Sequence, residues 1–255
     1  MRLSLRTMLS KSQIDKIIEH IGFVPENIKQ VKALMSAKKP KEAIGLLALD
    51  REFVIYFLTM LRNADFYVDI GSKDVRIIAE QLDVNLLNSI IDSYALFLKF
   101  PKKCEIFDIS TIKLVELNAK ILCHWDKILT QIRYRSARNS SLASLMMLNI
   151  LLAELVFVSF VNSVDGILDI CDISYDEIFE KMYSQGLFFT TALMLDFNLK
   201  TLPPSEKNIV EYFKILICYE ISQPGFCSAG FDKIFNLSAV ADTQMLVEFK
   251  RALVR

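Results

Sequence analysis

Glycine and proline are scarce in this sequence. The 255 residues contain 7 glycines and 6 prolines, about half the share expected from average usage of roughly 7% and 5%. Proteins built from many short strands need these residues at their turns, so the scarcity disfavours a β-sandwich or a β-barrel. Hydrophobic residues make up 53% of the chain, which is enough to bury a large core. We therefore expect an all-α, multihelical protein with no substantial β-sheet.

The sequence has no excess of charge of either sign, because 30 Lys and Arg balance 30 Asp and Glu. This balance excludes a globally basic nucleic-acid binder, so we expect no nucleic-acid partner. The first residues, Met1 to Ser12, contain no apolar stretch of signal-peptide length, which disfavours secretion. The five cysteines are odd in number and widely spaced, as is typical of small core residues in a reducing compartment. We expect a cytoplasmic protein.

One apolar run, Leu142 to Val161, has about the length of roughly 20 residues that crosses a bilayer. Glu154 lies near its middle, and a carboxylate there would cost roughly 2.5–3.5 kcal/mol on insertion scales. A helix that is apolar on all sides also forms the centre of large helical proteins. We expect the buried helix and no membrane span.

Helical spacing of apolar residues recurs along almost the whole chain. We predict one helix over 12–20, with Ser12 as N-cap and Gly22 as the stop, and others over 27–37 and from Pro40 to Ala48. Asp50, Ser72, Asp83 and Asp108 are expected to begin the next four helices. A dense apolar run, Phe53 to Leu61, predicts a helix buried on most sides. Further helices are predicted over 142–161, 174–182, 190–197, 205–221 and 242–254.

The best candidate boundary in the chain is Pro101 to Glu105. Residues 1–100 contain short helices and residues 101–255 contain longer ones, so we predict two subdomains. We expect them to share one core and to form a single domain, because the boundary has no composition typical of a flexible linker.

Residues for catalysis or metal binding are few. Divalent metal ions need four to six donors, whereas the sequence has only His20 and His124, and neither has a second histidine at ligand spacing. Cys123 and His124 cannot act as a dyad, because adjacent helix residues diverge by about 100°. There is no Gly-x-Ser-x-Gly elbow and no glycine-rich phosphate loop. We expect no catalytic, cofactor-binding or metal-ligating residue, and no enzyme activity.

A basic cluster with one aromatic residue comprises Arg133, Tyr134, Arg135 and Arg138. Such a cluster can contact phosphates or an acidic partner. The alternative is a solvated loop between two helices, since no further basic residues extend the patch. These four residues are the candidate partner surface.

The first hundred residues resemble the HDOD family, whose members are bacterial regulatory proteins built like the metal-dependent HD phosphohydrolases but with degraded catalytic residues. Phe23-Val24-Pro25 is similar to the family's Leu-Pro entry, and the stretch from Ala43 to Asp50 resembles its helix that ends in an acidic residue. The strongest match is Leu58 to Tyr67, which is similar to Leu-Leu-Arg-Leu-Ala-Asn-Ser-x-x-Tyr. The family-signature positions are therefore Asp50, Leu61, Asn63 and Tyr67. We expect Asn63 to order the turn after its helix through side-chain bonds to backbone.

The weaker resemblance beyond residue 100 places the metal ligands of the HD enzymes on apolar residues. The first histidine falls at about Val115, and the His-Asp pair falls at Ile150 and Leu151. The segment Gly186 to Leu199 resembles the next helix of the family, and it also contains no histidine. In addition, Arg76 and Gln81 replace small residues of the family pattern. Isoleucine and leucine cannot bind a divalent ion, so the resemblance implies a non-catalytic relative.

We therefore expect a non-enzymatic bacterial signal-transduction module that contacts other signalling proteins. Small-ligand binding in the degenerate site is a further option, and a homo-oligomer is compatible with the sequence. The alternative is a residual metal-dependent phosphohydrolase, acting on a nucleotide second messenger with metal held by carboxylates alone. Exposed apolar side chains on the short N-terminal helices are the second expected contact surface.

Overall fold

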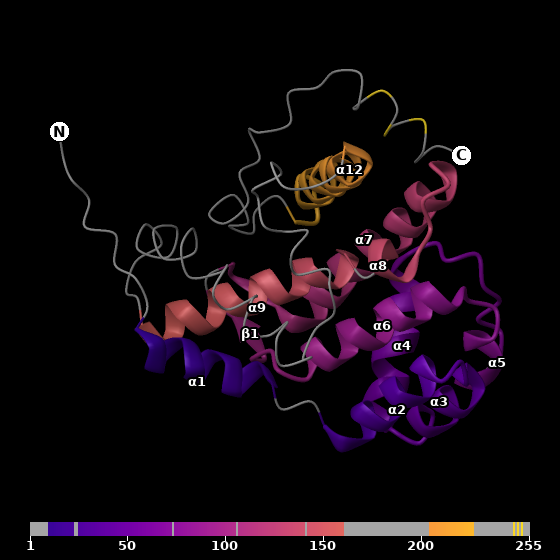
Figure 1. Ribbon diagram of the computed structural model, residues 1–255, viewed down its shortest axis with the longest axis horizontal. Coiled ribbons are helices and arrows are strands. Elements are labelled where there is room, and N and C mark those ends of the chain that lie inside the picture. Colours follow the sequence, from indigo (N-terminus) through magenta and orange to yellow (C-terminus); the bar gives the residue numbers. More distant parts are fainter. Residues whose placement is uncertain are drawn as a thin grey trace.

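The computed structural model describes residues 10–22, 25–72, 74–105, 107–140, 142–160 and 204–226, together with 247, 249 and 251. This part of the chain is mostly helical, and its one sheet has two short strands, which confirms the predicted all-α fold (Figure 1). β1 (Lys103–Cys104) pairs antiparallel with β2 (Ile109–Ser110). The helices are α1 (Lys11–Gly22), α2 (Glu26–Ser36), α3 (Pro40–Leu47), α4 (Arg51–Asn63), α5 (Val75–Ala79), α6 (Val84–Phe97), α7 (Thr111–Gln131), α8 (Ala137–Ser140), α9 (Leu142–Phe160) and α12 (Pro204–Ile221).

Several predicted helix starts are confirmed. Pro40 opens α3, where its missing N–H costs nothing. Asp50 caps α4 by accepting the backbone N–H of Glu52 at 2.9 Å, and Asp83 caps α6 through Asn85 at 2.8 Å. The predicted helices over 174–182 and 190–197, and most of 242–254, lie outside the described residues.

Three predicted caps are wrong by two residues. The α1 cap is Ser10, not Ser12, because the Ser10 backbone N–H donates to Gln13 Oε1 at 2.7 Å in a capping box. The α5 cap is Asp74, not Ser72. The α7 cap is Ser110, whose Oγ accepts from the Lys113 N–H.

Asp108 does not cap α7 because the chain turns at this residue between β1 and β2. Its φ is 48°, and its carboxylate lies 2.5 Å from Lys103 Nζ. A left-handed residue in a turn does not supply the extended backbone that an N-cap requires.

Helix α4 is less buried than its apolar run predicts. Phe53, Tyr56, Phe57, Met60 and Leu61 are buried on one face, whereas the side chain of Ile55 is 56% exposed. Helix α4 is therefore amphipathic and presents an apolar residue to solvent.

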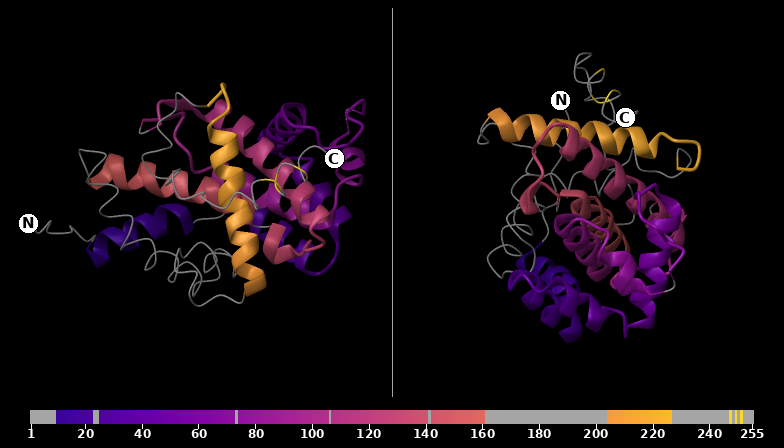
Figure 2. Two further views of the ribbon diagram at one scale, coloured as in Figure 1. Left: turned by 90° about the horizontal axis from the view of Figure 1, so that it is seen from above. Right: turned by 90° about the vertical axis from the view of Figure 1, so that its right-hand side faces the viewer.

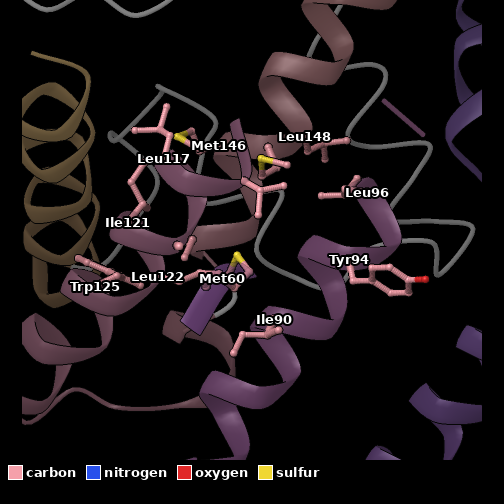
Figure 3. Packing of buried hydrophobic residues seen from close by; sticks show 14 of the residues in the cluster. Met60, Ile90, Tyr94, Leu96, Leu117, Ile121, Leu122, Trp125, Met146 and Leu148 are labelled. Carbon is pink, nitrogen blue, oxygen red and sulfur yellow. The ribbon is translucent and has the colours of Figure 1, made fainter. Parts of the chain in front are cut away.

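Helix α7 is the centre of the molecule. It contacts α4, α6, α9 and α12, and α12 crosses the outside of this layer (Figure 2). Figure 3 shows its residues Leu117, Ile121, Leu122 and Trp125 packing in the same core as residues of α6 and α9. Buried side chains on both sides of residue 101 belong to one continuous cluster. The subdomain boundary itself stays a prediction.

Helix α9 packs inside this core. Met146, Leu148 and Leu151 are fully buried, and the buried Glu154 carboxylate accepts the Glu105 backbone N–H at 2.9 Å. Within the described ranges, no helix is long and apolar enough to span a membrane. The apolar run is therefore observed as a buried helix, as predicted.

Candidate functional site

The family-signature residues have distinct structural roles. Asp50 caps α4 and also accepts a hydrogen bond from the Tyr94 hydroxyl at 2.8 Å. Leu61 is buried in the core. Asn63 Nδ2 donates to the carbonyl of Thr59 at 2.8 Å. The Asn63 side chain thus bonds back to a carbonyl of its own helix, rather than ordering the turn after that helix as predicted.

Tyr67 differs from the other signature residues because it faces solvent. It is 75% exposed, and its φ is 42°. A bulky side chain in the left-handed region is an outlier that costs about 1–2 kcal/mol, and such strain is concentrated at functional sites. Tyr67 is therefore the signature residue best placed for an external contact.

The loop that presents Tyr67, residues 64–72, is tied to the body of the protein at two points. Gln81 clamps the backbone of Asp69, accepting its N–H at 2.8 Å and donating to its carbonyl at 3.3 Å. Cys123 on α7 donates to the carbonyl of Asp65 at 3.0 Å. Gln81 thus fixes the position of this loop through two hydrogen bonds to the backbone of Asp69.

A cleft of about 240 Å³ opens beneath this loop, and we call it the Tyr67 cleft. It joins the loop to the start of α6, to α7 and to Arg135. The cleft is lined by Asp65, Phe66, Tyr67, Gln81, Leu82, Asp83, Leu86, Cys123, Asp126, Lys127 and Arg135. Two residues singled out in the sequence, Tyr67 and Arg135, therefore share one site.

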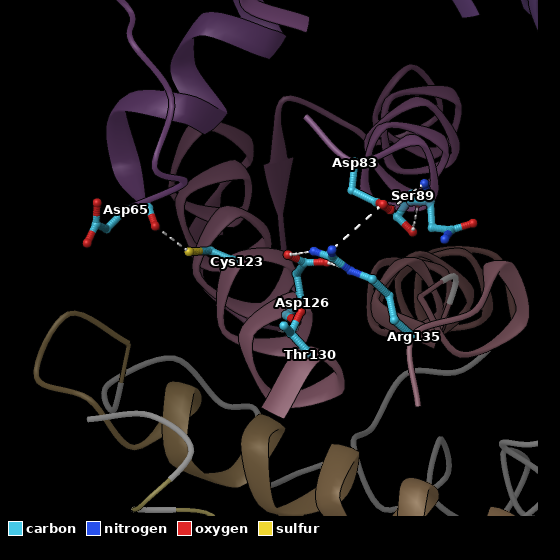
Figure 4. Close-up of polar contacts among 8 residues, drawn as sticks. Asp65, Asp83, Ser89, Cys123, Asp126, Thr130 and Arg135 are labelled. Atoms are coloured by element: carbon cyan, nitrogen blue, oxygen red, sulfur yellow. Dashed lines mark hydrogen bonds and ion pairs between the residues drawn. The ribbon is translucent and has the colours of Figure 1, made fainter. Parts of the chain in front are cut away.

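Arg135 is held by two aspartates at the edge of the cleft (Figure 4). Its Nε donates to Asp126 Oδ1 at 3.0 Å and its Nη2 donates to Asp126 Oδ2. Its Nη1 lies 3.7 Å from Asp83 Oδ2. The hydrogen bonds with Asp126 raise the pKa of the Arg135 guanidinium, so Arg135 is a fixed cation that joins α7 to the start of α6.

Lys127 is the second cation of the cleft. Its Nζ lies 3.8 Å from Asp65 Oδ2 and 4.6 Å from the centroid of the Tyr67 ring, within the range of a cation–π contact. Only 20% of the Lys127 side chain is exposed. Lys127 therefore supports one face of an exposed aromatic ring.

The chemistry of the Tyr67 cleft suits recognition better than catalysis. Its two cations are each matched by carboxylates, as described above. Burial raises the pKa of the Cys123 thiol to about 11, so it is not a thiolate nucleophile at neutral pH. The cleft offers an exposed ring and fixed charges.

Arg133 and Tyr134 lie in the turn between α7 and α8 and are exposed, and hydrogen bonds hold the backbone of this turn. Asn139 donates to the Tyr134 carbonyl at 2.8 Å, and Trp125 Nε1 donates to the Asn139 carbonyl at 2.7 Å. Tyr134 is 47% exposed, and Arg133 is exposed with a φ of 60°. The side chain of Arg138 lies outside the described residues.

The positions that resemble the metal site of HD enzymes are filled by the core. Val115 is 3% exposed, and Ile150 and Leu151 are fully buried. In the described part of the chain, no group of three or more His, Cys, Asp or Glu side chains could hold a metal ion. The segment Gly186 to Leu199 lies outside that part.

The two histidines have different surroundings. His20 is exposed near the end of α1. His124 on α7 is hydrogen-bonded through Nδ1 to Glu220 on α12, and the Glu220 side chain is only 1% exposed. This pair joins two helices, and the sequence alone did not indicate it, because 96 residues separate the partners.

Sequence reasoning also missed Asp126 and Lys127 as parts of the site. Neither belongs to a local motif, and only their approach to Arg135 and Tyr67 in the fold reveals them. Comparisons of the chain with protein-family models, with curated proteins and with solved structures find no match. The resemblance to the HDOD family stays a prediction.

Proposed function

We propose that this protein is a non-enzymatic, cytoplasmic bacterial signal-transduction module of HDOD type that acts by binding other signalling proteins. The observation that carries the proposal is Tyr67, an exposed aromatic ring held in a strained conformation at the mouth of a cleft. Tyrosine and arginine are, with tryptophan, enriched at the energetic centres of protein interfaces, and Arg135 lines the same cleft.

The interior of the helical bundle supports the non-enzymatic part of the proposal. Val115, Ile150 and Leu151 stand where the resemblance expects metal ligands, and all three are buried among apolar side chains. A hydrolase of the HD type needs a water-accessible metal at that place. A packed apolar core would have to open before any ion could enter.

A macromolecular partner fits the Tyr67 cleft better than a small ligand. Pockets that enclose drug-sized ligands have volumes of roughly 300–1,000 Å³, and this cleft has about 240 Å³. An exposed ring beside a small cleft suits an anchor that enters a partner's surface. The buried thiols of Cys104 and Cys123 are unpaired, which supports a reducing, cytoplasmic setting.

Affinity capture with matched baits tests this proposal. Tagged wild-type protein, Tyr67→Ala and Ile112→Ala are expressed in the native host, crosslinked mildly and captured, and the bound proteins are quantified by mass spectrometry. Ile112 is the control because it is equally exposed, at 75%, at the start of α7. We expect a sensor, kinase or motility component that wild type and Ile112→Ala retain and that Tyr67→Ala loses. Equal recovery by all three baits, or no enriched partner, would argue against the Tyr67 cleft as the contact.

A further inference from the structure

The charges that line the Tyr67 cleft do not cancel. Among the described residues, three aspartates and two cations line it, namely Asp65, Asp83, Asp126, Lys127 and Arg135. The single positive charge of Arg135 faces two of these aspartates (Figure 4). Arg133, which is also exposed in the basic cluster, does not line the cleft. The lining of the cleft therefore carries a net negative charge, although the basic cluster contributes to it.

The negative charge of the cleft is exposed, whereas its nearest positive charge is covered. The side chain of Asp65 is 75% exposed, but that of its partner Lys127 is only 20% exposed. Lys127 Nζ and Asp65 Oδ2 lie 3.8 Å apart, which is longer than a charge-assisted hydrogen bond. The same loop presents Asp69, a second exposed aspartate. A partner that approaches loop 64–72 therefore meets carboxylates first.

The position of Lys127 shows that Asp65 and Tyr67 lie around one cation. Its Nζ is 3.8 Å from the Asp65 carboxylate and 4.6 Å from the centroid of the Tyr67 ring. Lys127 lies over one face of the ring, yet Tyr67 stays 75% exposed. The exposed ring and the exposed carboxylate therefore offer the same pair of contacts to a second cation that arrives from solvent.

We propose that the partner of the Tyr67 cleft presents an arginine side chain, which stacks on the exposed Tyr67 ring and pairs with Asp65. This inference rests on the proposed function, because it names the chemistry of the partner that the function requires. Arginine suits both groups, since its planar guanidinium stacks on aromatic rings and binds a carboxylate through two parallel N–H donors. It is also more weakly hydrated than the ammonium of lysine. An acidic segment would instead be repelled by the exposed carboxylates.

NMR titration of the full chain with three blocked peptides tests the proposal. The peptides are Ac-Gly-Leu-X-Leu-Gly-NH2, in which X is arginine, citrulline or glutamate. Citrulline is the matched probe because it keeps the shape of arginine without its charge. Ring signals are observed in protein with labelled tyrosine, and Tyr67→Phe assigns the signal of Tyr67. Each titration is carried out at about 20 mM and at about 200 mM salt, because screening weakens exposed charge pairs.

Asp65→Asn removes the exposed charge while keeping the size of the side chain. The Asp65 carbonyl that Cys123 contacts belongs to the backbone, so the substitution leaves this contact in place. Glu26→Gln on α2 is the matched control, because the Glu26 side chain is 73% exposed and also pairs with one lysine, Lys29, at 3.3 Å. Thermal melting checks that both variants are folded.

At low salt we expect the arginine peptide to shift the Tyr67 signal with a Kd about fivefold or more below that of the citrulline peptide. High salt should reduce this difference. Asp65→Asn should raise the Kd of the arginine peptide about threefold or more, and Glu26→Gln should leave it unchanged.

Three outcomes would overturn the proposal: equal affinity for all peptides, tighter binding of the glutamate peptide, or no shift of the Tyr67 signal with any of them. Unchanged affinity in Asp65→Asn would overturn the pairing with Asp65. None of these results decides the proposed function, because capture with the Tyr67→Ala bait uses no peptide and tests that function separately.

Discussion

The Tyr94 hydroxyl on α6 donates a hydrogen bond of 2.8 Å to the Asp50 carboxylate, across 44 residues of sequence. The same carboxylate caps α4, and Asn27 on α2 approaches it at 3.4 Å. Asp50 therefore links three helices through one side chain. The sequence identifies Asp50 as a helix cap and as a position of the HDOD resemblance, and the structure adds a tertiary link between helices.

Replacing Asp50 should cost more than the loss of a cap. We expect Asp50→Ala to lower the free energy of unfolding by about 2–4 kcal/mol, because a lost N-cap costs about 1 kcal/mol and an unsatisfied buried hydroxyl about 1–3 kcal/mol. Urea denaturation measures the loss. Asp74→Ala is the control, since Asp74 caps α5 without a buried tyrosine partner, and it should have the smaller effect. Equal losses would contradict the link to Tyr94.

Two buried tyrosines predict that stability falls at alkaline pH. Burial raises the pKa of Tyr56 above its ordinary value near 10. Burial, followed by the hydrogen bond with Asp50, raises the pKa of Tyr94. The folded protein therefore holds these phenol protons more tightly than the unfolded chain does. Their full contribution to the free energy of unfolding is present below pH 10, and it is lost as the pH rises above 10.

The buried thiols make the loss of stability begin at a lower pH than the tyrosines alone would. Burial raises the pKa of Cys104 to about 12 and that of Cys123 to about 11, from an ordinary value of 9.0. We expect the melting temperature to fall from about pH 9 upward, more steeply above pH 10. Tyr56 alone contributes up to about 1.4 kcal/mol per pH unit. Tyr56→Phe should make the melting temperature fall less steeply above pH 10, whereas Tyr134→Phe, at an exposed position, should not. If both variants show the slope of the wild type, the loss of stability does not come from Tyr56.

Arg133 should be replaceable by glycine with a gain in stability. Its N–H donates to the Thr130 carbonyl at 3.2 Å, and the Tyr134 N–H donates to the Leu129 carbonyl at 3.0 Å. With a φ of 60° at Arg133, these bonds form a Schellman motif at the end of α7, whose left-handed position favours glycine. We expect Arg133→Gly to raise the free energy of unfolding by about 1 kcal/mol. Arg133→Ala should give no such gain, and a gain of similar size would contradict this explanation.

Arg135 and Asp126 should show measurable coupling in a double-mutant cycle. Their side chains are 33% and 18% exposed, and they form two parallel hydrogen bonds. We expect a coupling free energy of about 0.5–1 kcal/mol that decreases at high salt. The exposed pair Lys29 and Glu26 serves as the comparison, with coupling close to zero. Absence of coupling between Arg135 and Asp126 would contradict the description of Arg135 as a cation held in place by Asp126.

Local sequence signals predicted much of the fold. The scarcity of glycine and proline, together with helical apolar spacing, predicted the helical class, and Pro40, Asp50 and Asp83 marked their helices correctly. These signals are reliable because each depends on hydrogen bonds within one turn of the chain.

The sequence could not show which of two neighbouring polar residues caps a helix. Asp108 and Ser110 are both good cap residues, and the pairing of β1 with β2 decides between them by fixing Asp108 in a turn. Similarly, the apolar run of α4 does not reveal that Ile55 faces solvent, because nothing in the sequence says which side of a dense run lacks a neighbour.

Single residues of the Tyr67 cleft could be predicted from the sequence, but their arrangement in one cleft could not. Tyr67 and Arg135 were both identified from sequence, one from a family signature and one from a basic cluster. Their convergence on one cleft, with Asp126 and Lys127 between them, depends on contacts between residues far apart in the chain. Such contacts have no local pattern in a single sequence.

Metal analysis of the purified protein tests the central claim most directly. The protein is grown with added manganese and iron, analysed for bound metal and assayed for cleavage of phosphodiesters. Because apolar side chains fill the positions of Val115, Ile150 and Leu151, we expect far less than one metal ion per chain and no hydrolysis above background. Stoichiometric metal together with phosphodiester cleavage would contradict the account and establish the residual phosphohydrolase instead.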